Sequence, residues 1–390
     1  MTRNTQLLLF FCAVGCIAAG AGIYDSIFNN YLNDTFELSA EARGWLELPR
    51  ETPGFLVFLT AGALAAAPLT RVGLAAALTY GVGMAGLALL GSSYAPMLAM
   101  LLVSSTGMHL LQPVASSVAL GLSEEGGRGR RLGQMGAVGT LGAIAGTGFV
   151  WLVFDQAAPQ YRLGFLCTAG LACAAGFLYA CMHIPHLHKP RSRLVIRRKF
   201  ALYYLLELFF GARKQIFITF GPWVLIKVYG EPATSIAGLL MTAAVIGVVF
   251  KPLAGVAIDR FGERAVLVAD GLVLTVVCLG YGYALPLMGG NMERARGLAC
   301  ACFVADNLLF ALGSGRAVYI SRIADSPQEL SSTLAMGVSV NHIVSMTIPI
   351  VAGTVWALFG YERVFLSAAA LAIVIAAFAS RVPGPRRGRP

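Results

Sequence analysis

Charged residues are scarce in this sequence: Asp, Glu, Lys and Arg make up 12% of its 390 residues, against roughly 25% in an ordinary soluble domain. Hydrophobic residues make up 57%, and the mean hydropathy is +0.73. This composition excludes an ordinary soluble globular protein. Apolar runs of about 20 residues, the length that a helix needs to cross a bilayer, recur along the chain. The sequence therefore predicts an all-α polytopic membrane protein.

Other absences narrow the function. The eight cysteines form no Cys-x-x-Cys pair, which argues against a disulfide framework or a zinc site. We therefore predict no cofactor and no resident metal. The N-terminal stretch has no clean cleavage site and an apolar run longer than a signal-peptide core, so we expect a retained first helix. No close His/Asp or Ser/His constellation and no soluble catalytic domain is apparent, and the chain is not predicted to be an enzyme.

The apolar runs predict twelve transmembrane helices in two pseudo-repeats of six. We expect an N-terminal bundle over 1–183, a cytoplasmic basic linker over 184–199 and a C-terminal bundle over 200–390 that ends in a short basic tail. The expected helices are 7–31, 44–67, 72–91, 96–121, 132–154, 161–183, 200–226, 232–256, 265–287, 297–322, 331–358 and 361–380.

Lysine and arginine placement predicts the orientation. With both termini in the cytoplasm, cytoplasmic segments hold 18 of the 29 basic residues and outer loops hold 6, as the positive-inside rule requires. We therefore expect a multi-pass protein of the cell (inner) membrane with both termini cytoplasmic. Because the net charge of +10 is spread as an orientation signal, we expect no nucleic-acid partner.

A motif between the eighth and ninth expected helices is more specific. The segment GVAIDRFGER contains Gly255, Asp259, Arg260, Gly262 and Arg264. It resembles the cytoplasmic loop signature of the major facilitator superfamily, G-x-x-x-D-R-x-G-x-R. The glycines would permit a tight turn and a close helix approach, and the Asp and Arg would form a breakable charge latch. The first-half copy, AAAPLTRVG, has Thr70 in place of the acid, so we expect a weaker latch there.

The resemblance implies that the first, fourth, seventh and tenth helices line a central cavity. Polar residues gather on those helices, whereas the third, sixth, ninth and twelfth, the expected outer supports, carry almost none in their interiors. A charge inside the bilayer costs roughly 2.5–3.5 kcal/mol or more, so these residues should face the cavity or one another. The candidates for substrate binding are Asn29, His109, Gln112, Arg213, Lys214, Gln215, Asn307 and Arg316.

Arg213 and Lys214 are adjacent cations about thirteen residues into the seventh helix, near mid-depth, and only Glu207 is an acid nearby on that helix. Glu207 and Lys214 are seven residues apart and should share a face. The excess of positive charge favours an anionic substrate group such as carboxylate, phosphate or sulfonate, with Arg213 as a bidentate contact. The alternative is that these charges form interhelical salt bridges only.

Two further groups of charged residues are predicted to have roles other than direct binding. Asp25, Asp306 and Glu207 are candidates for proton or cation coupling, and the alternative for the two aspartates is a salt bridge to Arg213, Lys214 or Arg316. Near the outer end of the second helix, Glu47, Arg50 and Glu51 have i, i+3, i+4 spacing. We expect this cluster to act as a gate.

The sequence predicts a secondary active transporter that moves a small, anionic organic solute by alternating access, coupled to protons or sodium. The alternatives are an exporter of drug-like amphipathic compounds, a metal-ion transporter and, from other classes, a membrane-embedded enzyme or a non-transporting sensor. The expected partners are the solute, the coupling ion and the lipid bilayer, and we expect a monomer.

Overall fold

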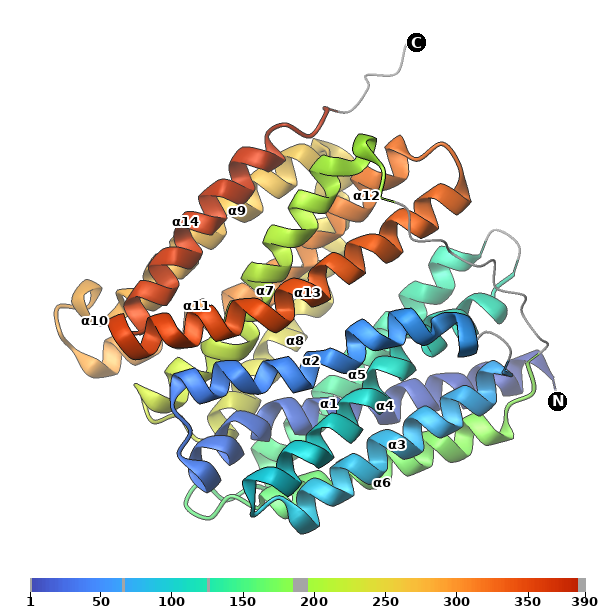
Figure 1. The fold of residues 1–390 in the computed structure, drawn as a ribbon, viewed down its shortest axis with the longest axis horizontal. Helices are drawn as coiled ribbons and strands as arrows, with labels where there is room; N and C mark the ends of the chain where they lie inside the picture. The colour runs from blue at the N-terminus through green and yellow to red at the C-terminus, as the bar shows by residue number, and fades with distance from the viewer. Residues whose placement is uncertain (1, 65–66, 125–126, 185–195, 385–390) are drawn as a thin grey trace. The chain divides into compact units, whose positions relative to one another are not determined.

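The computed structural model describes residues 2–64, 67–124, 127–184 and 196–384. Within these ranges the regular structure is helical and contains no strand (Figure 1). The predicted linker at 184–199 and the basic tail fall largely outside the described residues. The helices of the first half are α1 (Arg3–Phe36), α2 (Ala40–Leu64), α3 (Leu69–Leu90), α4 (Tyr94–Gly121), α5 (Arg128–Val153) and α6 (Tyr161–Cys181).

The second half begins with a short 3-10 helix and has a broken tenth span. Its elements are η1 (Arg198–Phe200), α7 (Ala201–Lys227), α8 (Ala233–Phe261), α9 (Glu263–Gly282), α10 (Ala284–Leu287), α11 (Met292–Leu309), η2 (Phe310–Gly313), α12 (Ser314–Ile323), α13 (Pro327–Phe359) and α14 (Tyr361–Ala379). The expected ninth helix was too long, because α9 ends at Gly282 and α10 is a separate turn. The expected tenth helix is divided into α11, η2 and α12.

The prediction of an all-α polytopic membrane protein is confirmed. Among the described residues, ten helical segments are long and apolar enough to cross a membrane, so the count of twelve is not reproduced by length and hydropathy. Helices α2 and α7 do not meet this criterion. Both carry the charged residues that the sequence singles out, and those residues lower the mean hydropathy of the helix.

The chain forms two compact units, and each contains a short piece of the other half of the sequence. The first unit comprises 1–37, 49–191 and 231–244, and the second comprises 38–48, 192–230 and 245–390. The start of α2 is thus grouped with the second half, and the start of α8 with the first. The division into bundles at 183 and 200 remains a prediction.

Close helix approach organises the first unit, in which α1 packs on α5 and α6, and α3 packs on α4 and α6 (Figure 1). Gly146 on α5 is one position at which this approach requires glycine. A Cβ added at Gly146 would lie 2.0 Å from the carbonyl oxygen of Ala19 on α1, far inside van der Waals contact. The two backbones could not approach so closely with a larger residue at this position.

In the second unit, α7 packs on α13 and α9 packs on α14. A cluster of buried apolar side chains joins the N-terminal turns of α7 to α9, α12 and the end of α14, and its central members are Phe200, Tyr203, Leu206, Leu267, Tyr319, Ile320, Ala379 and Val382. This packing holds α7 in place, so the polar side chains at the middle of α7 have fixed positions.

Candidate functional site

Two buried ion pairs occupy the interior of the second unit. Arg213 on α7 is 1% exposed and its Nη2 donates to Oδ1 of Asp306 on α11 at 2.8 Å. Arg316 on α12 donates through Nε to Oε1 of Glu207 on α7, also at 2.8 Å. Glu207 was predicted to share a face with Lys214. In the structure its ion-pair partner is Arg316, which lies on another helix.

Aromatic rings flank both guanidinium groups. The Cζ of Arg213 lies 4.5 Å from the ring centre of Phe310, and the Cζ of Arg316 lies 3.5 Å from that of Phe210. Cation–π contact of this kind adds stabilisation where water is excluded. In this structure Arg213 is therefore held inside the second unit and does not present a fork to a solute. The structure agrees with the alternative in which the charges form interhelical salt bridges, and the four residues in these bridges are Arg213, Asp306, Glu207 and Arg316.

Lys214 is arranged differently from its neighbour. Its side chain is partly exposed, and its Nζ donates to Oδ1 of Asn341 on α13 at 2.8 Å. Ser345, one turn further along α13, donates to the same oxygen at 3.4 Å. Asn307 is also partly exposed and donates to the carbonyl of Phe303. Of the two adjacent cations, only Lys214 is placed where a solute could reach it.

A second buried polar cluster joins the start of α2 to α7. Arg43, which the sequence analysis did not single out, donates to Oε1 of Glu47 at 2.5 Å. Gln215 donates through Nε2 to Oε2 of Glu47 at 2.8 Å and to Thr219 at 3.3 Å. Glu47 and Gln215 are buried, so this cluster helps to fix the start of α2 on α7.

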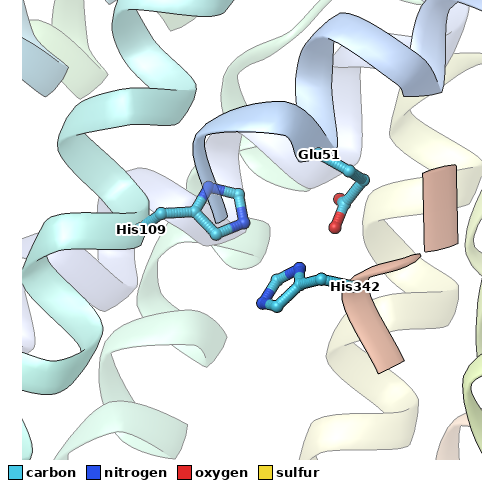
Figure 2. A group of neighbouring side chains, drawn as sticks. All are labelled: Glu51, His109 and His342. Carbon is cyan, nitrogen blue, oxygen red and sulfur yellow. The ribbon is translucent and has the colours of Figure 1, made fainter. Parts of the chain in front are cut away.

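The first unit holds the remaining predicted groups. Arg50 and Glu51 form an ion pair at 3.0 Å. On α4, Nδ1 of His109 lies 3.1 Å from the hydroxyl of Ser105, which in turn donates to the carbonyl of Arg50. Figure 2 shows Glu51 on α2 and His109 on α4, and their ligand atoms lie within 4.8 Å of each other. The figure also draws His342 of α13, which belongs to the second unit.

Asp25 is the most accessible of the three acids predicted for coupling, because Asp306 and Glu207 are buried. Its side chain is exposed, whereas Asn29 one turn later on α1 is buried and Gln112 on α4 is exposed. Arg50 is close enough to act on Asp25 electrostatically. Among the residues that the structure describes, Asp25 forms no ion pair.

The predicted latch motif is only partly explained by the structure. Gly262, which precedes α9, has a φ of 82°, so its glycine is required by the turn. Gly255 does not mark a close helix approach: an added Cβ would meet no described atom within 4 Å. Asp259, Arg260 and Arg264 are exposed and form no ion pair with any residue in the described ranges. The acid that pairs is Glu263, which contacts Arg322 of α12.

Three functional candidates were missed by sequence reasoning: Arg43, Glu263 and Asp270. Asp270 is 3% exposed on α9, a helix that was expected to be an apolar outer support. The signal was present, since a lone acid in an apolar span is costly. The resemblance gives no role to an acid there, because it assigns the cavity to the first, fourth, seventh and tenth helices.

Comparisons with known proteins agree with this architecture. The profile of the Major Facilitator Superfamily matches residues 10–325. A mutant of the nucleoside transporter NupG superposes with a TM-score of 0.79 at 15% identity, over 96% of this chain and 98% of that one. The D-xylose-proton symporter gives 0.75 at 15% identity over 100% of both chains.

A third structure, the inward-facing and occupied form of a bacterial homolog of the human lysosomal transporter Spinster, gives a TM-score of 0.72 at 14% identity. It covers 98% of this chain and 97% of that one. At these identities the structures establish the fold alone. No curated protein matches the sequence.

The apolar helices define the class, a multi-pass helical membrane protein. Because the family profile spans most of the chain, the assignment can be made narrower. The chain belongs to the Major Facilitator Superfamily, as the GVAIDRFGER motif indicated, and it is a transporter and not an enzyme.

Proposed function

We propose that the protein is a secondary active transporter that moves a small organic solute with an anionic group by alternating access, in symport with protons or sodium. It works as a monomer in the cell (inner) membrane with both termini cytoplasmic, the orientation supported by the 18 to 6 distribution of basic residues. The observation that carries the coupling is the exposed carboxylate of Asp25 inside the long apolar helix α1.

The argument from Asp25 is energetic. A charged side chain in the hydrocarbon core costs roughly 2.5–3.5 kcal/mol or more, and Asp25 has no ion-pair partner among the described residues. Such a carboxylate is tolerated where water or a cation reaches it. Asp25 therefore marks a water-accessible path along α1, and it is placed to bind a proton or sodium there. The charge of Arg50 nearby would respond to that binding.

The proposed binding of the anionic solute depends on Lys214. An ammonium on a flexible stem binds carboxylate or phosphate as a point charge, and Lys214 is partly exposed at the middle of α7. Asn341 holds its Nζ and so directs it. We therefore assign the anion contact to Lys214, with Asn307 as a neighbouring polar group on α11, and leave Arg213 in its buried pair with Asp306.

Flux in proteoliposomes tests the coupling. Asp25→Asn should abolish accumulation of solute against its gradient and leave exchange at equal concentrations intact, because binding survives but the coupling ion is lost. The control is Glu41→Gln, an exposed acid near the start of α2. Accumulation by Asp25→Asn at the control's level would refute coupling through this residue.

Ligand binding tests the substrate class separately. A thermal-shift screen of organic carboxylates, phosphates and sulfonates should find compounds that raise the melting temperature of the wild type. Lys214→Met should weaken the affinity by about 1.5–3 kcal/mol, the range for charge-assisted hydrogen bonds. Unchanged affinity in Lys214→Met would exclude Lys214 as the anion contact.

A second function, divalent metal transport, is favoured by one observation. Glu51 and His109 offer an oxygen and a nitrogen ligand within 4.8 Å of each other in the first unit, a mixed donor set that suits zinc or manganese. If metal is the cargo, Zn²⁺ or Mn²⁺ should raise the melting temperature of the wild type and not of Glu51→Gln. No shift with either metal would remove this alternative.

A further inference from the structure

Asp270 is a buried acid that neither the proposed substrate site nor the proposed coupling site uses. It lies on α9 with 3% of its surface exposed, and its Oδ1 has no hydrogen-bond partner among the described residues. Arg213 also has unused hydrogen-bonding capacity. Its Nη2 serves Asp306, but its Nε and Nη1 are buried without partners in the part of the chain that the structure describes. An unsatisfied acceptor and two unsatisfied donors thus lie in the same interior.

The charges of this interior do not balance. Glu207 pairs with Arg316, and Asp306 pairs with Arg213. Asp270 is a third carboxylate within electrostatic reach of both arginines and of Asp306. With every group ionised, the five residues would carry one net negative charge away from water. Burying an uncompensated charge costs far more than burying a neutral acid.

Among the described residues, the cations that act on Asp270 electrostatically are Arg213 of α7 and Arg316 of α12. Asp306 of α11 is the acid that interacts with it. On α9 itself Cys278 lies near Asp306 and Arg213. Beside Asp270, Gly271 packs against alanines of α14, where an added Cβ would come within 2.9 Å of the Cβ of Ala376.

We propose that Asp270 binds a proton and, together with Asp306 and Arg213, forms a second proton site that lies wholly within the second unit. With the proton on Asp270, Arg213 pairs with Asp306 as observed. When the O–H bond of Asp270 breaks and its proton passes to water, the new carboxylate accepts from one of the unused N–H groups of Arg213. The arginine is then shared between two acids on different helices.

This change of partner at Arg213 would alter the contacts of the tenth span, which is divided into α11, η2 and α12. Asp306 lies one turn before η2, and Arg316 lies just after it on α12. A change in how Arg213 is shared alters the pull on α11, while the Glu207–Arg316 pair holds α12 to α7. The role of this exchange in transport rests on the proposed proton coupling, but the bound proton itself does not.

Infrared spectroscopy of the protein in liposomes tests the proton directly. The wild type at neutral pH should show the C=O stretching band of a protonated carboxylic acid, and carbon-13 label in aspartate should shift that band. The band should be lost in Asp270→Asn and retained in Asp25→Asn. A band that is absent from the wild type, or that survives in Asp270→Asn, overturns the proposal.

Thermal melting of the empty protein gives an independent readout. Asp270→Asn replaces one neutral group by another and should leave the melting temperature at neutral pH unchanged. Asp306→Asn removes the observed partner of Arg213 and should lower the melting temperature, because Asp270 must then lose its proton to balance the charge. An equal loss in both variants would show that Asp270 is an ionised counter-ion, against the proposal. Because Asp25→Asn flux and the Asp270 band are measured separately, failure of one proton site is distinguishable from failure of the other.

Discussion

At the scale of single residues, burial decides which of the predicted polar groups can bind a solute. Arg213 and Lys214 are neighbours in sequence, yet Arg213 is 1% exposed and Lys214 is partly exposed. Adjacent residues of a helix point about 100° apart, so one faces into the second unit and the other does not. The same contrast separates Asp306, which is buried and paired, from Asp25, which is exposed.

The Arg213–Asp306 pair should be a strong determinant of stability. Asp306→Asn removes the observed hydrogen-bonded partner of a buried guanidinium and should destabilise the empty protein by about 3 kcal/mol. Removing both charges, in Arg213→Met with Asp306→Asn, should recover part of that loss. The measurement is thermal melting in detergent with Glu293→Gln, an exposed acid of α11, as the control. Equal melting temperatures for Asp306→Asn and the control would contradict this role.

At the scale of the helices, the junctions are fixed by specific backbone and capping features. Gly262 separates α8 from α9 at a φ of 82°. Ser326 caps α13 by accepting from the backbone N–H of Glu329, whose carboxylate accepts from Arg197 at 2.6 Å and Lys199 at 2.8 Å. The start of α13 is thereby tied to the segment that leads into α7.

Two glycines of the same motif provide a matched comparison. Gly262→Ala forces a Cβ into a backbone conformation used almost only by glycine and should destabilise the protein by about 1–3 kcal/mol. Gly255→Ala adds a methyl group where no described atom lies within 4 Å, in the interior of α8. It should be neutral or stabilise by up to about 1 kcal/mol. Melting temperatures in the reverse order would show that the motif works through Gly255.

The cluster of Glu329, Arg197 and Lys199 predicts that the stability of the protein falls at acidic pH. Hydrogen bonding from Lys199 holds the pKa of Glu329 below its ordinary value, so the folded state favours the carboxylate. This contribution is present above the ordinary pKa of about 4.3 and is lost as the pH falls through the lowered value. Glu329→Gln should abolish that part of the acid loss in melting temperature.

Lys199 gives the opposite sign at the other end of the pH range. Its hydrogen bonds to Asp325 and Glu329 raise its pKa, so its contribution is lost only as the pH rises above about 10.4. Melting curves recorded from neutral pH downwards therefore exclude the titration of Lys199, and the comparison with Glu329→Gln assigns the part due to Glu329. If the melting temperature falls equally at acidic pH in the wild type and in Glu329→Gln, the cluster is not the origin of that fall.

At the scale of the whole molecule, transport by alternating access requires contacts that form in one state and open in another. The start of α2 is a candidate, because it is held to α7 by Glu47 and Gln215 and lies very close to α13. A Cβ added at Gly44 would be 2.2 Å from the carbonyl oxygen of Pro349. Such a contact forms only with glycine at this position.

Gly44→Leu should therefore destabilise the state in which α2 is docked on α13 and shift the balance toward the other. The readout is labelling of a cysteine at position 215, in a background without the eight native cysteines, by a water-soluble thiol reagent. Labelling should be faster with Gly44→Leu. Gly133→Leu, at an open position of α5, is the control. Equal labelling rates in the two variants would show that the α2–α13 contact does not gate access.

The sequence by itself determined the class, the approximate helices and the family, because these depend on the length of apolar runs and on one local motif. Most helix ends are close to those predicted, since apolar runs and glycines or prolines delimit them. The exceptions are the ninth span, which ends at Gly282 and not at 287, and the tenth, whose apolar run at 297–322 does not reveal that η2 interrupts it at Phe310–Gly313.

The tertiary structure alone decided which charges meet. Asp306 is 93 residues from Arg213, and Arg316 is 109 residues from Glu207; no local pattern can specify such pairs. Spacing placed Glu207 and Lys214 on one face of a single helix, whereas a buried charge takes the partner that its neighbouring helices provide. The same reason explains why Asp270 was missed: its importance comes from the two arginines that α7 and α12 bring to it.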